Sequence, residues 1–308
     1  MEFKPFGWRH FEANVPEDWG LTKEGGSKGQ GFFQLEDRYN VRMEVAWQYA
    51  PFEKAPDPYE TFNNYVKDLG KKMKKLKLPE PTLVKKEEYE VYGHEGMHGL
   101  FKAGVWVNST YIWYCEIMEK MFTLTLLHKV DEEFNDIERQ IVESIKCHYK
   151  PGEKALWTMY KMGVRIPADF YLVSARFTTG LSYILWRNKE EQQVLLSVFY
   201  APFSSRILRD FGSVDKLLNK FVKKDILGKY AKFGKIKSEE KKLNGLRGHE
   251  FSSSIMTFSF DRIMLKGYLF VNEKDRLLGA LIVFPKKKYG EKAQKTIKNV
   301  LNQLLSHT

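Results

Sequence analysis

The chain has 308 residues, of which 43% are hydrophobic and 29% are charged. No stretch approaches the roughly 20 apolar residues that a membrane span needs, and the N-terminal MEFKPFGWRHFEANVP lacks the apolar run of a signal peptide. Only two cysteines occur, Cys115 and Cys147, neither in a C-x-x-C pair, so no disulfide framework is predicted. We therefore expect a cytoplasmic protein without membrane contact.

The net charge of +11 is distributed unevenly along the chain. Residues 1–150 carry 21 Lys+Arg and 25 Asp+Glu, a balance of −4, whereas residues 151–308 carry 29 and 14, a balance of +15. Because the second half is basic, nucleic acid stays an alternative partner. Lys outnumbers Arg 38 to 12, which suits a solvated surface better than a base-reading one.

An internal duplication explains the order of motifs along the chain. The segment Val15-Pro16-Glu17-Asp18-Trp19 matches Ile166-Pro167-Ala168-Asp169-Phe170 at an offset of 151, and Tyr49-Ala50-Pro51-Phe52 matches Tyr200-Ala201-Pro202-Phe203 at the same offset. Gly93-His94-Glu95 then matches Gly248-His249-Glu250 at an offset of 155. The sequence therefore predicts two tandem repeats, residues 1–150 and 151–308.

Hydrophobic periodicity gives the same elements in both repeats. In the first, strands at 31–50 form a hairpin, a helix begins after the N-cap Asp57, strands fill 82–128, and a helix ends near 145. In the second, the hairpin covers 181–201, Ser213 caps the helix, strands fill 234–284, and a helix covers 293–304. The pattern is β-β-β-α-β-β-β-β-α in each repeat. We expect the α+β class, with a mainly antiparallel sheet packed with helices.

The order of these anchors resembles a known fold. Pro16-x-x-Trp19, a hairpin, a helix, a strand opening with Gly93-His94-Glu95 and a last helix ending near Ser144-Ile145 are similar to the PsbP-like fold, once in each repeat. This resemblance implies a non-enzymatic binding module. It transfers no functional residue, because no functional motif of that family is matched.

His94-Glu95-Gly96-Met97-His98 has the H-E-x-x-H spacing of zinc hydrolases. That spacing requires a helix, whereas Gly93, Gly96 and Gly99 and the flanking residues favour a strand, in which the two histidines are about 13 Å apart. The second repeat keeps His249-Glu250 without a second histidine. The sequence therefore predicts neither a metal nor a cofactor. We also expect a His98→Ala substitution to leave the stability of the protein nearly unchanged.

Other motifs give no catalytic site. The run GGSKGQG at 25–31, which contains Lys28, fits neither phosphate-binding glycine pattern, and no G-x-S-x-G elbow occurs. An enzyme of unrecognised type stays an alternative.

The strand YIWYCEI at 111–117 places Tyr111 and Trp113 on one face and Ile112 and Tyr114 on the other. Helices are expected to cover one of these apolar faces, and the sister repeat or a bound ligand the other. We expect a non-catalytic binding or scaffolding protein whose partner is an unknown protein, peptide or small molecule, with nucleic acid as the alternative. The candidate binding residues are Tyr111, Trp113, His94, Glu95, His249 and Glu250.

Overall fold

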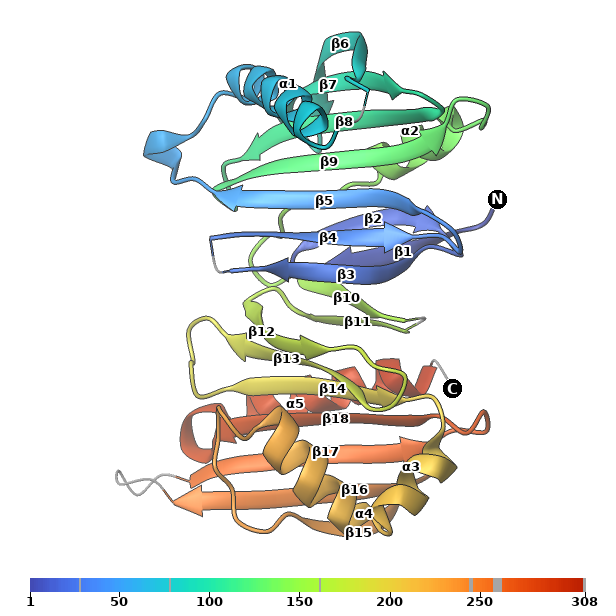
Figure 1. Ribbon diagram of the computed structural model, residues 1–308. Coiled ribbons are helices and arrows are strands. Elements are labelled where there is room, and N and C mark those ends of the chain that lie inside the picture. The colour runs from blue at the N-terminus through green and yellow to red at the C-terminus, as the bar shows by residue number, and fades with distance from the viewer. Residues whose placement is uncertain (28, 78, 161, 244–245, 257–261, 307–308) are drawn as a thin grey trace. The chain divides into compact units, whose positions relative to one another are not determined.

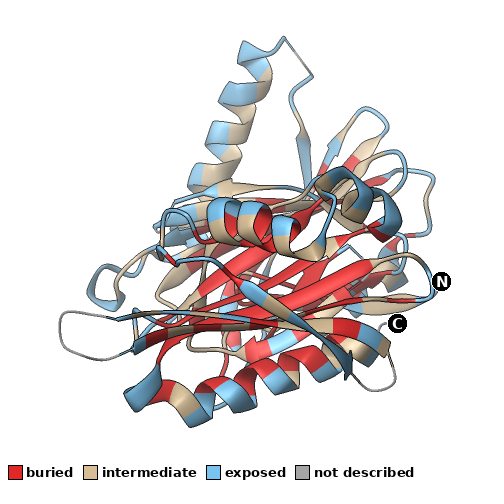
Figure 2. Cartoon of the chain, turned by 90° about the horizontal axis from the view of Figure 1, so that it is seen from below, coloured by how far each residue is buried: buried red, intermediate tan, exposed pale blue. Residues whose placement is uncertain are grey.

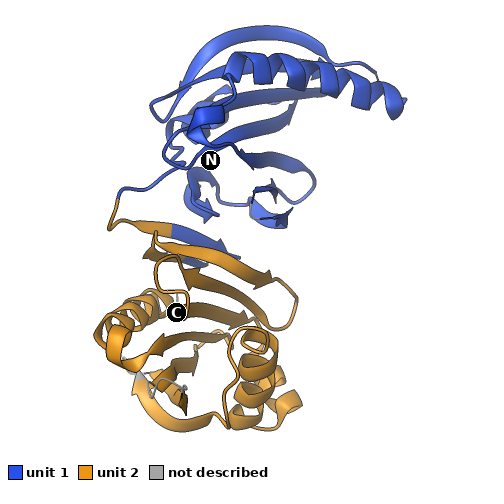
Figure 3. Ribbon diagram, turned by 90° about the vertical axis from the view of Figure 1, so that its left-hand side faces the viewer, with its two compact units in different colours: residues 1–150, 156–163 blue, residues 151–155, 164–308 orange. Residues whose placement is uncertain are grey.

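The computed structural model describes residues 1–27, 29–77, 79–160, 162–243, 246–256 and 262–306. Lys28 of the glycine-rich run lies outside these residues. Among the described helices, none combines the length and the apolar character required to cross a bilayer. The chain divides into two compact units, residues 1–150 with 156–163 (unit 1) and residues 151–155 with 164–308 (unit 2) (Figure 3).

Unit 1 is built on a seven-stranded antiparallel sheet (Figure 1). From one edge to the other its strands are β3 (Gly20–Gly26), β4 (Gln30–Glu36), β5 (Val41–Tyr49), β9 (Lys120–Lys129), β8 (Trp106–Cys115), β7 (His94–Ala103) and β6 (Thr82–Val91). The predicted hairpin at 31–50 is confirmed as β4 and β5.

Helices cover both faces of the unit 1 sheet. Helix α1 (Pro58–Lys75) begins where predicted, because the Asp57 carboxylate accepts a hydrogen bond of 2.7 Å from the backbone N–H of Tyr59. Its buried Phe62 packs with Ile112 and Tyr114 of β8 on one face. On the other face, Tyr111 of β8 donates a hydrogen bond to Glu138 of α2 (Asn135–Glu143). Elements of unit 1 thus contact both apolar faces of β8.

Unit 2 repeats this sheet with the same strand order. The strands are β12 (Phe170–Arg176), β13 (Ser182–Asn188), β14 (Leu195–Ala201), β18 (Leu277–Pro285), β17 (Arg262–Val271), β16 (Leu246–Met256) and β15 (Lys237–Leu243). The identical order agrees with a duplication, and the predicted α+β class with antiparallel sheets is confirmed.

One face of this sheet is packed by a broken helical segment of α3 (Ser204–Phe211), α4 (Val214–Leu217) and the π-helix η2 (Leu218–Ile226). Ser213 caps α4 as predicted, accepting a hydrogen bond from the backbone N–H of Lys216. Helix α5 (Lys286–Ser306) packs along β17 and β18. Figure 2 shows that buried residues are concentrated in the strands, whereas the outer surfaces of the helices are exposed.

The prediction of three strands before the first helix of each repeat was wrong. An additional hairpin precedes each sheet, formed by β1 (Phe3–Trp8) with β2 (Phe11–Pro16) and by β10 (Lys154–Met159) with β11 (Met162–Pro167). The first turn places Arg9 and His10 at positive φ, 52° and 70°. Such turns usually contain Gly or Asn, so the sequence carries no hairpin signal there.

Candidate metal centre

Three segments of unit 1 bring two histidines and two cysteines together. His94 is the first residue of β7, after a tight turn in which Tyr92 and Gly93 have positive φ. Cys115 is the last residue of β8. Because β7 and β8 pair antiparallel with Gly96 opposite Trp113, the same register brings the start of β7 beside the end of β8.

Cys147 and His148 come from the segment that follows α2. The backbone of Lys146 exchanges two hydrogen bonds of 2.8 Å with Glu12 of β2, which fixes the position of the next two residues. Cys115 and Cys147 are fully buried, and His94 is 6% exposed. The fold, rather than a sequence motif, therefore determines where the four side chains meet.

The four donor atoms lie within 4.8 Å of one another. His148 Nδ1 is 3.3 Å from His94 Nε2, 3.6 Å from Cys115 Sγ and 3.6 Å from Cys147 Sγ. For zinc bonds of about 2.05 Å to nitrogen and about 2.3 Å to sulfur, the edges of a ligand tetrahedron are about 3.3 Å between nitrogens and about 3.6 Å between nitrogen and sulfur. The three separations around His148 Nδ1 therefore fit a tetrahedral Cys2His2 site.

Side chains around the four donor residues support this arrangement. Glu116 Oε2 lies 2.7 Å from His94 Nδ1, so a proton on Nδ1 leaves the lone pair of Nε2 directed at the cluster. The Tyr92 ring packs on His148 with centroids 4.9 Å apart. Trp113 is buried on β8, and its indole N–H lowers the pKa of the Cys147 thiol, although Cys115 and burial raise that pKa more.

The electrostatics of the cluster favour the thiolate of one cysteine, Cys115. A hydrogen bond from the Cys147 thiol, together with His94, holds the pKa of Cys115 well below its usual value despite burial. The same contact raises the pKa of Cys147, and the Cys115 sulfur raises the pKa of His94. Thiolate is the form of cysteine that binds metal ions.

His98 lies in a separate polar network on the same strand. The prediction that His94 and His98 share a strand is confirmed by β7. His98 Nδ1 is 2.8 Å from Glu87 Oε1, and its Nε2 is 2.8 Å from Ser109 Oγ, the order of groups in a Ser-His-carboxylate triad. Ser109 is fully buried in mid-strand and donates its proton to Glu138, so it cannot reach a substrate.

The other predicted binding residues have different surroundings within each unit. Tyr111 stacks on His98 and donates a hydrogen bond to Glu138, and Trp113 is buried against Phe122. In unit 2, the Glu250 carboxylate pairs with Lys241 and Lys266, and β16 places His249 opposite the apolar Leu269. Both cysteines of the chain belong to unit 1, so unit 2 has no equivalent thiols.

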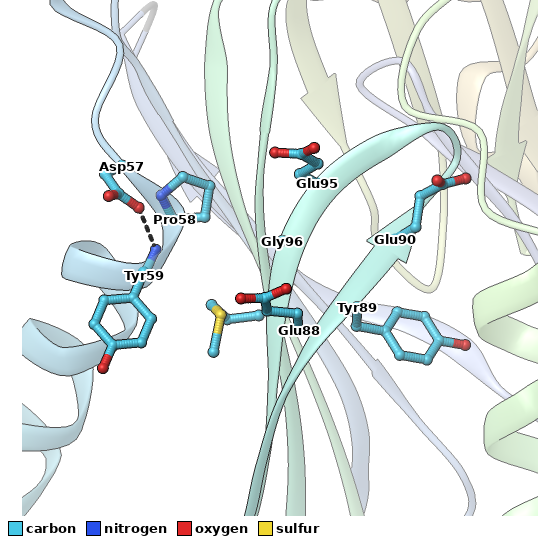
Figure 4. Close-up of a pocket in the computed structure, with 9 residues that line it drawn as sticks. Asp57, Pro58, Tyr59, Glu88, Tyr89, Glu90, Glu95 and Gly96 are labelled. Atoms are coloured by element: carbon cyan, nitrogen blue, oxygen red, sulfur yellow. Dashed lines mark hydrogen bonds between the residues drawn. The ribbon is translucent and has the colours of Figure 1, made fainter.

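Glu95 lines a cavity of about 520 Å3 between the start of α1 and strands β6 and β7 (Figure 4). Asp57, Glu88 and Glu90 line it as well, and Glu90 is directly opposite Glu95 in the β6–β7 pair. Tyr89 of β6 lines the cavity too, and its ring points away from Asp57 in Figure 4. Glu95 therefore faces this cavity, whereas its neighbour His94 belongs to the cluster with the two cysteines.

Comparison with known proteins gives a likeness of fold alone. No protein-family model and no curated protein matches this chain. The solution structure of PsbP from Synechocystis sp. PCC 6803 is 11% identical, with a TM-score of 0.37, and the match covers 47% of this chain and 92% of that one. The predicted PsbP-like resemblance is thus found at the level of the fold.

A second solved structure aligns with nearly the whole chain. The immunity protein TplEi of the T6SS from Pseudomonas aeruginosa, complexed with "L" peptide, is 12% identical with a TM-score of 0.32. That match covers 97% of this chain and 96% of that one. At these TM-scores neither likeness carries an argument about function.

Proposed function

We propose that the first repeat, residues 1–150, is a metal-stabilised module in which His94, Cys115, Cys147 and His148 bind one zinc ion. The observation that carries this proposal is the set of three donor separations, 3.3, 3.6 and 3.6 Å, around His148 Nδ1. They match the three corresponding edges of a zinc tetrahedron. This proposal replaces the sequence-based prediction of no metal.

The donor set determines which metal and which role we propose. Two thiolates and two imidazoles in a tetrahedron suit zinc, whereas magnesium and calcium require oxygen ligands. Four protein ligands fill the coordination shell and leave no position for a water or substrate, which is the arrangement of structural rather than catalytic zinc. The ion would link β7, β8 and the segment after α2.

For the whole chain we propose a non-catalytic binding or scaffolding protein of two repeats, residues 1–150 and 151–308, acting in the cytoplasm. Two free cysteines in one cluster suit a reducing compartment, where they stay available to a metal. The Ser-His-Glu network at Ser109 supports a non-catalytic protein, because a buried serine bonded to Glu138 has a structural role.

Metal analysis of the purified full-length chain tests the zinc proposal. Protein prepared without chelators should hold about one zinc per chain, and Cys147→Ser should lose it. His249→Gln is the matched control, because His249 is the counterpart of His94 in a repeat without cysteines. Cobalt substitution should give the absorption bands of a tetrahedral thiolate site. Zinc well below one per chain after reconstitution, or equal loss in the His249→Gln control, would refute the proposal.

A further inference from the structure

The basic excess of the second half is concentrated in one segment of unit 2. Residues 220–242 contain nine lysines and three acidic residues, a balance of +6. The segment comprises most of η2, a connecting loop and β15, which is the last strand at one edge of its sheet (Figure 1).

The loop is folded back along the helix by Asn219. The Asn219 side chain accepts a hydrogen bond from the backbone N–H of Ile236 and donates one to its carbonyl, both 3.0 Å long. Ser238 donates a further hydrogen bond to Asp215 of α4. These bonds place Lys235 and Lys237, the neighbours of Ile236, beside the start of η2. The lysines next to Ile236 and those of β15 therefore lie along the same edge of the unit 2 sheet.

We define the basic edge as the exposed residues Lys229, Lys232, Lys235, Lys237, Lys242 and Arg247. None of these six side chains forms an ion pair in the part of the chain that the structure describes. Lys242 and Arg247 are directly opposite each other in the β15–β16 pair, an arrangement of like charges that is unfavourable without an anion between them. The acidic residues within the segment are Asp225, which pairs with Arg176, and Glu239 and Glu240 of β15, while Glu250 of β16 pairs with Lys241 and Lys266.

Apolar side chains of this segment are not available to a bilayer. Leu227 and Ile236 are fully buried, Ile226 is 1% exposed and Phe233 is 5% exposed, all in the core under η2. An interfacial membrane surface needs exposed apolar residues between its lysines. The basic edge has charge alone, which favours a hydrophilic polyanion over a lipid surface.

We propose that the basic edge binds the phosphate backbone of double-stranded nucleic acid without reading its sequence. Lysine is a point charge suited to phosphate, whereas base recognition depends mainly on the bidentate geometry of arginine, of which the edge has one. Its elements offer no row of exposed aromatic rings for stacking single-stranded bases, since Phe233 is buried and Tyr230 lies under Arg187.

The test measures the binding of the full-length protein to a fluorescent 20-base-pair DNA between 50 and 200 mM KCl. We expect micromolar binding at low salt and a log–log slope of about −4, because each phosphate contact contributes about −0.9. Combined substitution of Lys229, Lys232, Lys235 and Lys237 by serine should weaken binding at least tenfold and make the slope shallower by about 2 to 4.

The control removes the same charge elsewhere. Serine at Lys71, Lys72, Lys74 and Lys75, exposed residues at the end of α1, lowers the net charge equally and should change affinity less than twofold. Circular dichroism and size exclusion verify the fold of both variants. Equal losses in the two variants would reduce the effect to net charge and overturn the proposal. So would absence of binding at 50 mM salt, or tighter binding to phosphatidylserine vesicles than to DNA.

Discussion

His94 Nδ1 lies 2.7 Å from Glu116 Oε2, and this contact orients the imidazole so that its other nitrogen faces His148 and the two thiols. Glu116 follows Cys115 directly, so the last residue of β8 supplies a donor atom and the first residue of the turn after it supplies the carboxylate that orients His94. Half of the Glu116 side chain is exposed, at 51%, whereas His94 is buried. The carboxylate can therefore be altered without opening the core.

We expect Glu116→Gln to lower zinc affinity by 10- to 100-fold while keeping one zinc per chain at saturation. A glutamine still accepts a hydrogen bond from Nδ1 but adds no negative charge to the imidazole. Competition with a chromophoric chelator measures the affinity. Glu95→Gln is the control, since Glu95 is exposed on the other side of His94. An unchanged affinity in Glu116→Gln would show that this carboxylate does not tune the site.

Removal of the metal should destabilise unit 1. A ligand present at 1,000 times its dissociation constant adds about 4 kcal/mol to the free energy of unfolding, and a chelator removes that contribution. Urea unfolding of the full chain with and without chelator should show this difference. In Cys115→Ser the two curves should coincide. A chelator effect that persists in Cys115→Ser would place the metal elsewhere.

The sequence predicted much of the fold because each repeat carries its signals locally. Asp57 before Pro58 predicted the start of α1, and alternating residues predicted the β4–β5 hairpin. The sequence also predicted that a strand begins at His94, because the glycines on both sides oppose a helix.

The metal centre could not be predicted from local signals. Cys115 and Cys147 are 21 and 53 residues further along the chain than His94, and no motif has that spacing. Only the pairing of β7 with β8 and the hydrogen bonds between Lys146 and Glu12 bring the four side chains together. One signal of the metal centre was present in the sequence: both cysteines lie in the first repeat, and the second repeat has none. This difference in metal-binding residue types between the repeats points to the first repeat.

His98→Ala should destabilise the protein by about 2–4 kcal/mol without loss of zinc. The sequence predicted almost no effect, but His98 is 6% exposed and both ring nitrogens have hydrogen-bond partners. The substitution leaves a cavity beside Tyr111 and removes a hydrogen-bond partner of Ser109. Urea unfolding and metal analysis measure the two effects. His249→Ala, at a half-buried position, should cost under 1 kcal/mol. Loss of zinc in His98→Ala would contradict the separation of the two histidines.

Arg42 connects two carboxylates at one end of the unit 1 sheet. Its guanidinium donates two hydrogen bonds to Glu132, of 2.6 and 3.1 Å, and a third to Asp37. The bond from Arg42 holds the pKa of Glu132 below its usual value. Burial would raise the pKa of Asp37, but hydrogen bonds from the Tyr39 backbone and from Arg42 outweigh it and hold that pKa low as well.

These depressed pKa values predict a stability contribution that acid removes. In the unfolded chain the two carboxylates have their ordinary pKa values, 3.8 and 4.5. The contribution is therefore complete above about pH 5 and is lost as the pH falls through the lower folded values. At pH 7 we expect Arg42→Met to cost about 2 kcal/mol, and the gap from wild type to narrow steadily between pH 5 and pH 3. Urea unfolding at each pH measures this difference in the free energy of unfolding.

Arg139→Met is the control, because it breaks an exposed Arg–Asp pair and should cost under 0.5 kcal/mol at any pH. A gap for Arg42→Met that is independent of pH would mean that packing of the arginine stem, rather than its charge, stabilises this end of the sheet.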